Sequence, residues 1–205
     1  FLGAGKTTFL KNFARQFAGR RLRLIINEFG RAGVDGTLLR ELDAALDEIS
    51  NGSIFCACRL DQFEAALEQA AADAPDVALV EASGLADPTN VRRVLAQFPA
   101  VSYQGSVCVA DAARLEKVFS TARACPRQLA VSSLVLLNKT DLATEAQCAE
   151  AKALILRANP AARIRRTQFG RFEPEWLSLI VPDVDVDEVL DMPDITLQKA
   201  VLQIR

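Results

Sequence analysis

The sequence predicts an α/β fold in which a mostly parallel sheet is covered by helices on both faces. Short apolar runs alternate along the chain with longer segments of helical periodicity. The runs are apolar on both faces, which is typical of parallel strands in a sheet that helices cover on both sides. The chain has 205 residues, of which 50% are hydrophobic and 24% charged, and this suits one such domain with a small appendage.

The strands are expected at the four apolar runs, and helical periodicity fills much of the sequence between them. The runs cover residues 22–27, 76–82, 105–111 and 132–139. One helix face is formed by Phe9, Leu10, Phe13 and Phe17, and another by Ala66, Leu67 and Ala70. A further helix begins at Thr144, where Gln147 three residues later completes a capping-box pattern, and it ends near Asn159.

The main domain is expected to cover residues 1–182. An acidic, proline-containing stretch at 181–195 is the one clear shift in composition. Residues 183–205 are therefore interpreted as the start, or the remnant, of a C-terminal domain.

Charge and hydropathy argue against nucleic acid and membranes as partners. Lys and Arg total 24 against 26 Asp and Glu, so the net charge of −2 offers no basic surface for nucleic acid or anionic lipid. The apolar runs are far shorter than a membrane span, and the N-terminus lacks a signal-peptide pattern. We expect a cytoplasmic protein whose partners are small molecules or proteins, with five cysteines kept as reduced thiols.

The first ten residues, FLGAGKTTFL, contain most of a phosphate-binding loop. Glycines let backbone N–H groups surround phosphate oxygens, Lys6 can reach the outer phosphates, and the Thr7 hydroxyl can bind Mg²⁺. The predicted nucleotide-binding residues are Gly3, Ala4, Gly5, Lys6, Thr7 and Thr8. The alternative is a glycine turn that merely precedes an amphipathic helix. A P-loop follows a buried strand, so we expect the first strand of a P-loop NTPase sheet to precede Phe1, outside this sequence.

A second motif lies roughly 75 residues downstream, in the segment VALVEASG, at a strand end that a parallel sheet would place beside the phosphate-binding loop. Glu81 ends a buried strand there, where an acidic residue can hold Mg²⁺ through water, and Gly84 can donate its N–H to a γ-phosphate. The alternative for Glu81 is a carboxylate that caps the helix near Pro88.

The third motif, LLNKTDL at 136–142, selects the base. Asn138 can present its amide to the 6-keto and N7 edge of guanine, and Asp141 can accept from N1–H and the 2-amino group. The Lys139 stem can stack on the ring. Adenine lacks the donor pair that Asp141 needs, so the site should prefer GTP to ATP. A solvated loop is the alternative.

Together these motifs resemble the CobW-type GTPases, relatives of the HypB and UreG metal-insertion GTPases. The resemblance also includes NEFGRAGVDG at 27–36 and NGSIFC at 51–56, and it extends from Phe1 to about Pro160. It implies a P-loop GTPase that uses Mg²⁺ and that delivers or gates a metal, or a metal-containing cofactor, for a client protein. It also places Asn27, Glu28, Gly30 and Asp35 in a first switch region and residues 83–88 in a second. Members usually carry a further C-terminal domain.

The loop NGSIFCACRL at 51–60 departs from the family pattern Asn-Gly-Cys-x-Cys-Cys. Ser53 and Phe55 stand where the family has cysteines, and only Cys56 is kept. Cys58 is an addition, and in an extended segment it would face the same side as Cys56. The two thiolates, completed by Glu28 or by a ligand from a partner, could bind Zn²⁺ or Co²⁺. In the alternative, Phe55 packs the loop against apolar groups and Cys56 is a small buried side chain.

Two functions remain open at this point. In the first, the protein is an enzyme that hydrolyses GTP to GDP and phosphate, with Lys6, Thr7, Glu81 and Gly84 as the catalytic set. No residue obviously orients the attacking water, so we expect slow turnover that dimerisation or a client accelerates. In the second, the protein is a nucleotide-controlled gatekeeper or scaffold that binds a client without carrying metal. A small-molecule kinase is disfavoured by the NKTD motif.

Overall fold

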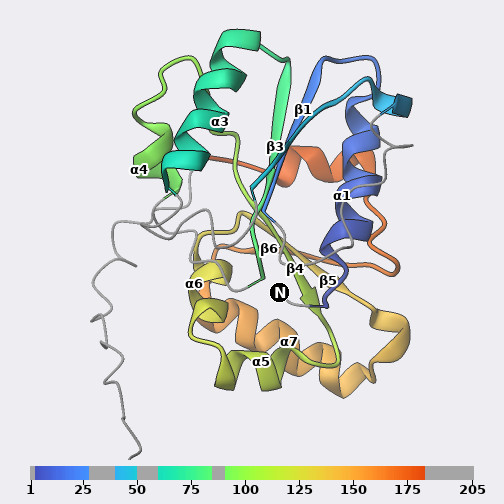
Figure 1. Cartoon of the computed structure of the whole chain (residues 1–205). Helices are drawn as coiled ribbons and strands as arrows, with labels where there is room; N and C mark the ends of the chain where they lie inside the picture. Colours follow the sequence, from blue (N-terminus) through green and yellow to red (C-terminus); the bar gives the residue numbers. More distant parts are fainter. Residues whose placement is uncertain (1–2, 28–39, 50–59, 85–90, 183–205) are drawn as a thin grey trace, which may run out of the picture.

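The computed structural model describes residues 3–27, 40–49, 60–84 and 91–182. It has the predicted α/β class, with parallel strands that are flanked by helices (Figure 1). The strands are β1 (Leu22–Ile26), β2 (Ala45–Glu48), β3 (Val77–Glu81), β4 (Val107–Asp111), β5 (Leu134–Asn138) and β6 (Arg163–Arg166). The α-helices are α1 (Lys6–Ala14), α3 (Leu60–Asp73), α4 (Val91–Leu95), α5 (Leu115–Thr121), α6 (Ala124–Ala130) and α7 (Glu145–Ala158). Short 3₁₀ turns occur at η1 (Arg15–Phe17), η3 (Thr140–Leu142) and η4 (Pro174–Leu179).

The strands form two parallel ladders within the described ranges. One has the order β2-β1-β3 and the other the order β4-β5-β6. In the second ladder Asp111 is in register with Asn138, so the ends of β4 and β5 lie side by side. The carboxyl ends of parallel strands share one edge, and side chains that follow those ends are therefore brought together there.

Strand β1 shows why the four predicted runs carry apolar residues on both faces. All five of its residues are buried. Leu24 and Ile26 pack with Leu10 of α1, whereas Ile25 packs with Phe63 and Leu67 of α3. The strand therefore separates two helices, one on each face, as Figure 1 also shows.

Helix α1 connects the two halves of the molecule. Its Leu10 and Ala14 pack against β1, while Phe9 and Phe13 belong to the core that surrounds β4 and β5. Phe9 stacks on Phe13 with ring centroids 5.2 Å apart, and Phe172 meets Phe13 edge-on at 4.8 Å. These aromatic contacts fix the helix that begins at the phosphate-binding loop.

Strand β3 differs from the expectation of burial on both faces. Leu79 contacts the main core, but Ala78 and Val80 are exposed, and 39% of the Val80 surface is accessible. Among the described strands β3 is hydrogen-bonded to β1 alone. A strand with one neighbour loses the cover that side chains of a second neighbour would provide.

Candidate nucleotide-binding site

The phosphate-binding loop has the backbone that its glycines predict. Gly3 has φ +69° and Gly5 has φ +95°, both in the left-handed region that side chains other than glycine rarely adopt. A Cβ on Gly5 would lie 2.6 Å from the Asn138 amide nitrogen, so this position also lacks space for a side chain. The loop is consequently a compact backbone structure.

The N-terminus of α1 directly follows this loop. Gly5 is the N-cap residue, no side chain caps the helix, and its first turn contains no Asp or Glu. Lys6 and Thr7 are half-buried in that turn and Thr8 is exposed. Helix N–H groups and the positive end of the helix dipole favour a phosphate at this position.

The Asn-Lys-x-Asp loop after β5 is bonded directly to the phosphate-binding loop. Asn138 is 2% exposed, and its Nδ2 donates to the Ala4 carbonyl at 2.8 Å. Lys139 has φ +60°, and its Nζ donates to the Gly3 carbonyl at 2.6 Å. Two neighbouring side chains therefore join the predicted base-reading loop to the predicted phosphate loop. Asp141 lies in η3 with its side chain exposed.

These contacts add a role for Asn138 that the sequence did not suggest. Its Oδ1 accepts from the N–H of Gly170 at 3.0 Å, so the amide is shared between the phosphate loop and the loop after β6. The expected contact of Asn138 with the guanine edge stays a prediction.

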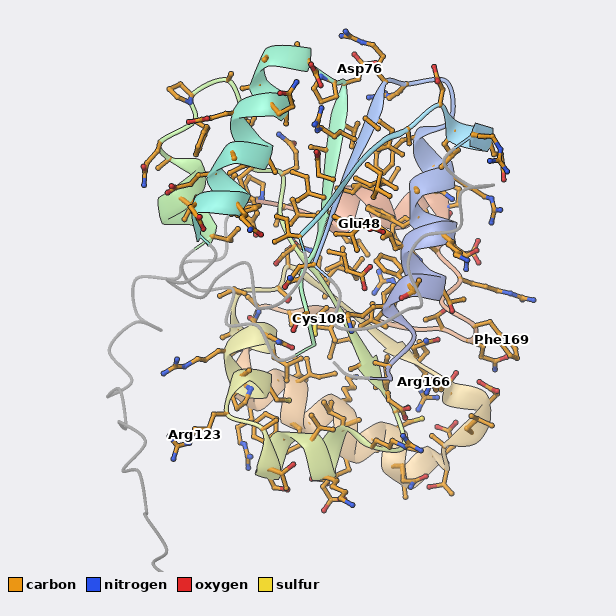
Figure 2. All side chains as sticks on the ribbon, viewed as in Figure 1. Glu48, Asp76, Cys108, Arg123, Arg166 and Phe169 are labelled. Atoms are coloured by element: carbon orange, nitrogen blue, oxygen red, sulfur yellow. The ribbon has the colours of Figure 1, made fainter. Side chains whose placement is uncertain are left out.

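The loop after β6 is a third part of the site that sequence reasoning missed. Gly170 has φ +61°, and a Cβ there would lie 2.7 Å from the Phe9 backbone nitrogen. Asn12 of α1 donates to the Phe169 and Gly170 carbonyls at 3.1 and 2.9 Å. Phe169 itself projects from the surface, 64% exposed (Figure 2). In the sequence, Gly170 was the one sign of a tight turn in this loop. That sign points to the site only when the strand before it, β6, has been recognised.

Glu81 occupies the strand end that its motif predicts. It is the last residue of β3, is 9% exposed, and accepts the Asn27 N–H on its backbone carbonyl at 2.9 Å. Gly84 follows in a turn, and its carbonyl accepts from the Gln128 side chain of α6 at 3.2 Å. A buried carboxylate at this edge of a parallel sheet has the chemistry of a magnesium ligand or of a group that holds its water.

A second buried carboxylate lies at the end of β4. Asp111 is 7% exposed, and its Oδ2 is 2.8 Å from the Lys139 ammonium. The sequence contained a signal for it, since the run GSVCVAD ends in an acidic residue just as VALVE does. We assigned it no role from sequence.

The predicted metal-loop residues Cys56, Cys58 and Glu28 lie outside the described residues. Within the described ranges, no cluster of three or more Cys, Asp, Glu or His side chains could hold a metal ion. The thiols of Cys108, Cys125 and Cys148 are unbridged and buried, and Cys108 belongs to the core around β4 and β5 (Figure 2). Burial raises the pKa of the Cys125 thiol to about 12 and also raises that of Cys108. Such thiols are chemically inert at neutral pH.

The family model described as the CobW/HypB/UreG nucleotide-binding domain matches residues 1–166. The chain belongs to this family. The resemblance stated from the motifs is thereby confirmed.

Relatives within the CobW/HypB/UreG family include two named as zinc chaperones. The zinc chaperone CobW of Pseudomonas aeruginosa is 32% identical over 198 residues, covering 79% of this chain and 52% of the relative. The zinc chaperone YjiA of Escherichia coli is 28% identical over 157 residues, covering 72% of this chain and 49% of the relative. The chain thus spans about half the length of these relatives.

Solved structures of the family share the fold. Zn(II)-bound YjiA GTPase from E. coli aligns with a TM-score of 0.64 at 22% identity, covering 89% of this chain and 58% of that one. The hydrogenase maturation factor HypB of Archaeoglobus fulgidus aligns with a TM-score of 0.56 at 22% identity, covering 86% of this chain and 83% of that one. These matches confirm the predicted P-loop α/β fold. None of the helices in the described ranges is both long and apolar enough to cross a bilayer.

Proposed function

We propose that this chain binds GTP and GDP with Mg²⁺ and hydrolyses GTP. The observation that carries the proposal is the pair of hydrogen bonds from Asn138 and Lys139 to the carbonyls of Ala4 and Gly3, at 2.8 and 2.6 Å. They hold the base-reading loop against the phosphate loop, so that one nucleotide can contact both. A solvated loop with no ligand would not need this attachment.

Base selection is assigned to Asp141. Its exposed carboxylate lies in η3, directly after the anchored Asn138 and Lys139. A carboxylate accepts two parallel N–H bonds, and guanine offers such a pair at N1 and the 2-amino group. Adenine offers no such pair, so ATP would leave this carboxylate without its partners.

The residues present fit a magnesium-bound triphosphate. Backbone N–H groups of the phosphate loop and the uncapped N-terminus of α1 provide anion-binding donors. Thr7 and the buried Glu81 offer oxygen ligands, which Mg²⁺ prefers, directly or through water. When bound, Mg²⁺ neutralises charge on the phosphates.

Hydrolysis would proceed by in-line attack of water on the γ-phosphate. Lys6 supplies positive charge to the outer phosphates, and the Gly84 N–H donates to the γ-phosphate as its charge changes. Lys6, Thr7, Glu81 and Gly84 thus remain the proposed catalytic set. No described residue has an evident role in orienting the water, so we expect slow basal turnover that a homodimer contact or a client protein accelerates.

We further propose that GTP binding controls delivery of a metal, or of a metal-containing cofactor, to a client protein. Support comes from relatives: CobW and YjiA are named zinc chaperones, and a relative in Schizosaccharomyces pombe is named a zinc-regulated GTPase metalloprotein activator. Cys56, Cys58 and Glu28 are the proposed ligands for Zn²⁺ or Co²⁺. The replaced family cysteines at Ser53 and Phe55 favour the second candidate, a gatekeeper that binds a client and carries no metal. We propose a cytoplasmic setting for either role, with residues 183–205 as the start, or the remnant, of a C-terminal domain.

Phosphate release from GTP tests the enzymatic part of the proposal. Lys6→Ala and Thr7→Ala should abolish turnover, and Glu81→Ala should reduce it while measurable nucleotide binding remains. Asp76→Asn is the control, because Asp76 pairs with Arg21 at the surface and lies outside the proposed site. An unchanged rate in the Glu81 variant would remove Glu81 from the catalytic set. A wild-type protein that releases no phosphate above a no-protein blank would contradict GTP hydrolysis.

A further inference from the structure

The starting observation is a buried acidic side chain to which the proposed chemistry gives no role. Asp111 ends β4, and its side chain is 9% exposed. Its Oδ1 accepts the backbone N–H of Ala113 at 3.1 Å, which leaves Oδ2 directed at Lys139, 2.8 Å away. Burying a carboxylate is costly unless it is paired, so this geometry depends on the lysine.

The lysine in turn depends on Asp111. The Lys139 side chain is 29% exposed, and its ammonium is shared between the Asp111 carboxylate and the Gly3 carbonyl of the phosphate loop. A lysine side chain has four carbon–carbon torsions and about 2 kcal/mol of rotamer entropy to lose when it is fixed in one place. A single carbonyl is a weak anchor for that purpose, whereas a buried carboxylate beside it supplies a charge-assisted bond.

The backbone around the pair is also fixed. Asp111 and Asn138 are register partners in the β4–β5 ladder, and the N–H of Ala112 donates to the Asn138 carbonyl at 2.9 Å. Lys139 then turns through a left-handed conformation at φ +60°, which directs the chain into η3. The pairing of β4 with β5 therefore fixes the backbone of Asp111 next to Asn138, where the base-reading loop begins.

We propose that Asp111 is a positioning residue of the nucleotide site, which holds the Lys139 ammonium on the Gly3 carbonyl and thereby keeps the lysine stem extended for contact with the base. This rests on the proposed guanine-nucleotide binding. The chain Asp111–Lys139–Gly3 joins the end of β4 to the phosphate loop, so base contact and phosphate-loop shape depend on one ion pair. Lys139 also neutralises a carboxylate that would otherwise repel a polyphosphate bound at the adjacent loop.

A double-mutant cycle separates this role from a general structural one. Asp111→Asn keeps an oxygen for the Ala113 N–H but removes the charge that faces Lys139. In the wild-type background it should weaken GTP and GDP binding about tenfold, the scale of losing one charge-assisted hydrogen bond. Lys139→Met keeps most of the stem and removes the ammonium. In that background Asp111→Asn should leave nucleotide affinity unchanged or improve it, because it removes an unpaired negative charge.

The outcomes distinguish the possible failures. If Asp111→Asn weakens GTP by the same factor in both backgrounds, Asp111 does not act through Lys139, and the inference is wrong. If the wild-type protein binds no guanine nucleotide, the proposed function fails and the nucleotide role of Asp111 fails with it. Asp76→Asn is again the control for removing one acidic charge.

A measurement without mutants covers the case in which Asp111→Asn does not fold. Acetylation of the nucleotide-free wild-type protein, followed by mass spectrometry, compares Lys139 with the exposed Lys152 of α7. An amine held between Asp111 and Gly3 should react about tenfold more slowly than a free surface amine, since it must first break a charge-assisted hydrogen bond. Equal reactivity of Lys139 and Lys152 would overturn the inference.

Discussion

Gly5 shows how much of the site depends on a single residue. It combines a left-handed φ of +95° with a predicted Cβ position only 2.6 Å from the Asn138 amide. A side chain there would be strained, and it would also displace the residue that bonds to Ala4. The phosphate loop and the base-reading loop therefore meet where only glycine fits.

Gly5→Ala should accordingly lose nucleotide affinity as well as stability. The backbone strain alone should cost about 1–2 kcal/mol of unfolding free energy, and the clash with Asn138 should weaken GTP binding by at least tenfold, a loss of about 1.4 kcal/mol. Gly19→Ala is a matched control, because Gly19 has φ +82° and no atom within 4 Å of its Cβ position. Thermal melts and calorimetric titration measure both effects. Equal loss of GTP affinity in the two variants would contradict the role given to Gly5.

The residues of the site could be predicted from sequence in part. Glycines, Lys6 and the NKTD loop have types and spacings that themselves indicate phosphate and guanine chemistry. The contacts of Asn138 with Gly170 and of Lys139 with Asp111 could not be predicted in this way, because each joins segments that are brought together only by the parallel register.

At the scale of elements, the buried strands were predictable and the polar ones were not. The apolar runs at 22–27, 76–82, 105–111 and 132–139 became β1, β3, β4 and β5. Strands β1 and β5 are buried on both faces, which favours apolar residues at successive positions, whereas β3 leaves Ala78 and Val80 exposed. The sequences ALDE of β2 and RIRR of β6 have no such pattern. Each pairs with one described neighbour and is only partly buried, so it needs few apolar residues.

Helix α7 was predicted from its first turn, and the structure confirms the capping box. The Thr144 hydroxyl accepts the Gln147 N–H at 3.2 Å, and the Gln147 side chain accepts the Thr144 N–H at 2.9 Å. The helix ends at Ala158, where Asn159 is the C-cap. A capping box satisfies two N–H groups that the helix itself leaves unpaired.

Thr144→Ala should lower the free energy of unfolding by about 1 kcal/mol and leave GTP affinity unchanged, because the cap stabilises α7 without touching the nucleotide loops. Thr121→Ala, in which the lost hydroxyl donates to the Lys117 carbonyl within α5, is the matched control and should cost less. Urea denaturation measures both variants. If Thr121→Ala lowers the free energy of unfolding as much as Thr144→Ala does, the capping box stabilises the protein no more than an ordinary hydroxyl hydrogen bond.

At the scale of the whole molecule, α1 couples the two ladders to one site. It packs on β1 through Leu10 and on the β4–β5 core through Phe13, and its N-terminus forms part of the phosphate loop. The proposed nucleotide binding at that terminus would therefore act on the element that holds both halves together. We expect the free energy of unfolding to rise with the GDP concentration c as RT ln(1 + c/Kd), so that it keeps increasing after the site is saturated.

The reactivity of Cys56 and Cys58 in the loop at 51–60 distinguishes the two candidate functions, metal carrier and gatekeeper. If the loop carries metal, alkylation of Cys56 and Cys58 should change among the nucleotide-free, GDP and non-hydrolysable GTP states, and Zn²⁺ or Co²⁺ should suppress it. Cys108, Cys125 and Cys148 are internal controls that should stay slow in every state, because they are buried. Mass spectrometry of the labelled peptides measures all five sites. If Cys56 and Cys58 are alkylated slowly in every nucleotide state and no metal co-purifies, the carrier role is contradicted and the gatekeeper role is favoured.

The central claim is that this site reads guanine through Asp141, and base exchange tests it most directly. Calorimetric titration should show that the wild-type protein binds GTP far more tightly than ATP. Asp141→Asn should weaken GTP by about 100-fold, the scale of two lost charge-assisted hydrogen bonds. The same variant should strengthen the binding of xanthosine triphosphate, whose 2-keto group replaces the amine and can accept from the new amide. Equal affinity of the wild-type protein for ATP and GTP would contradict the account.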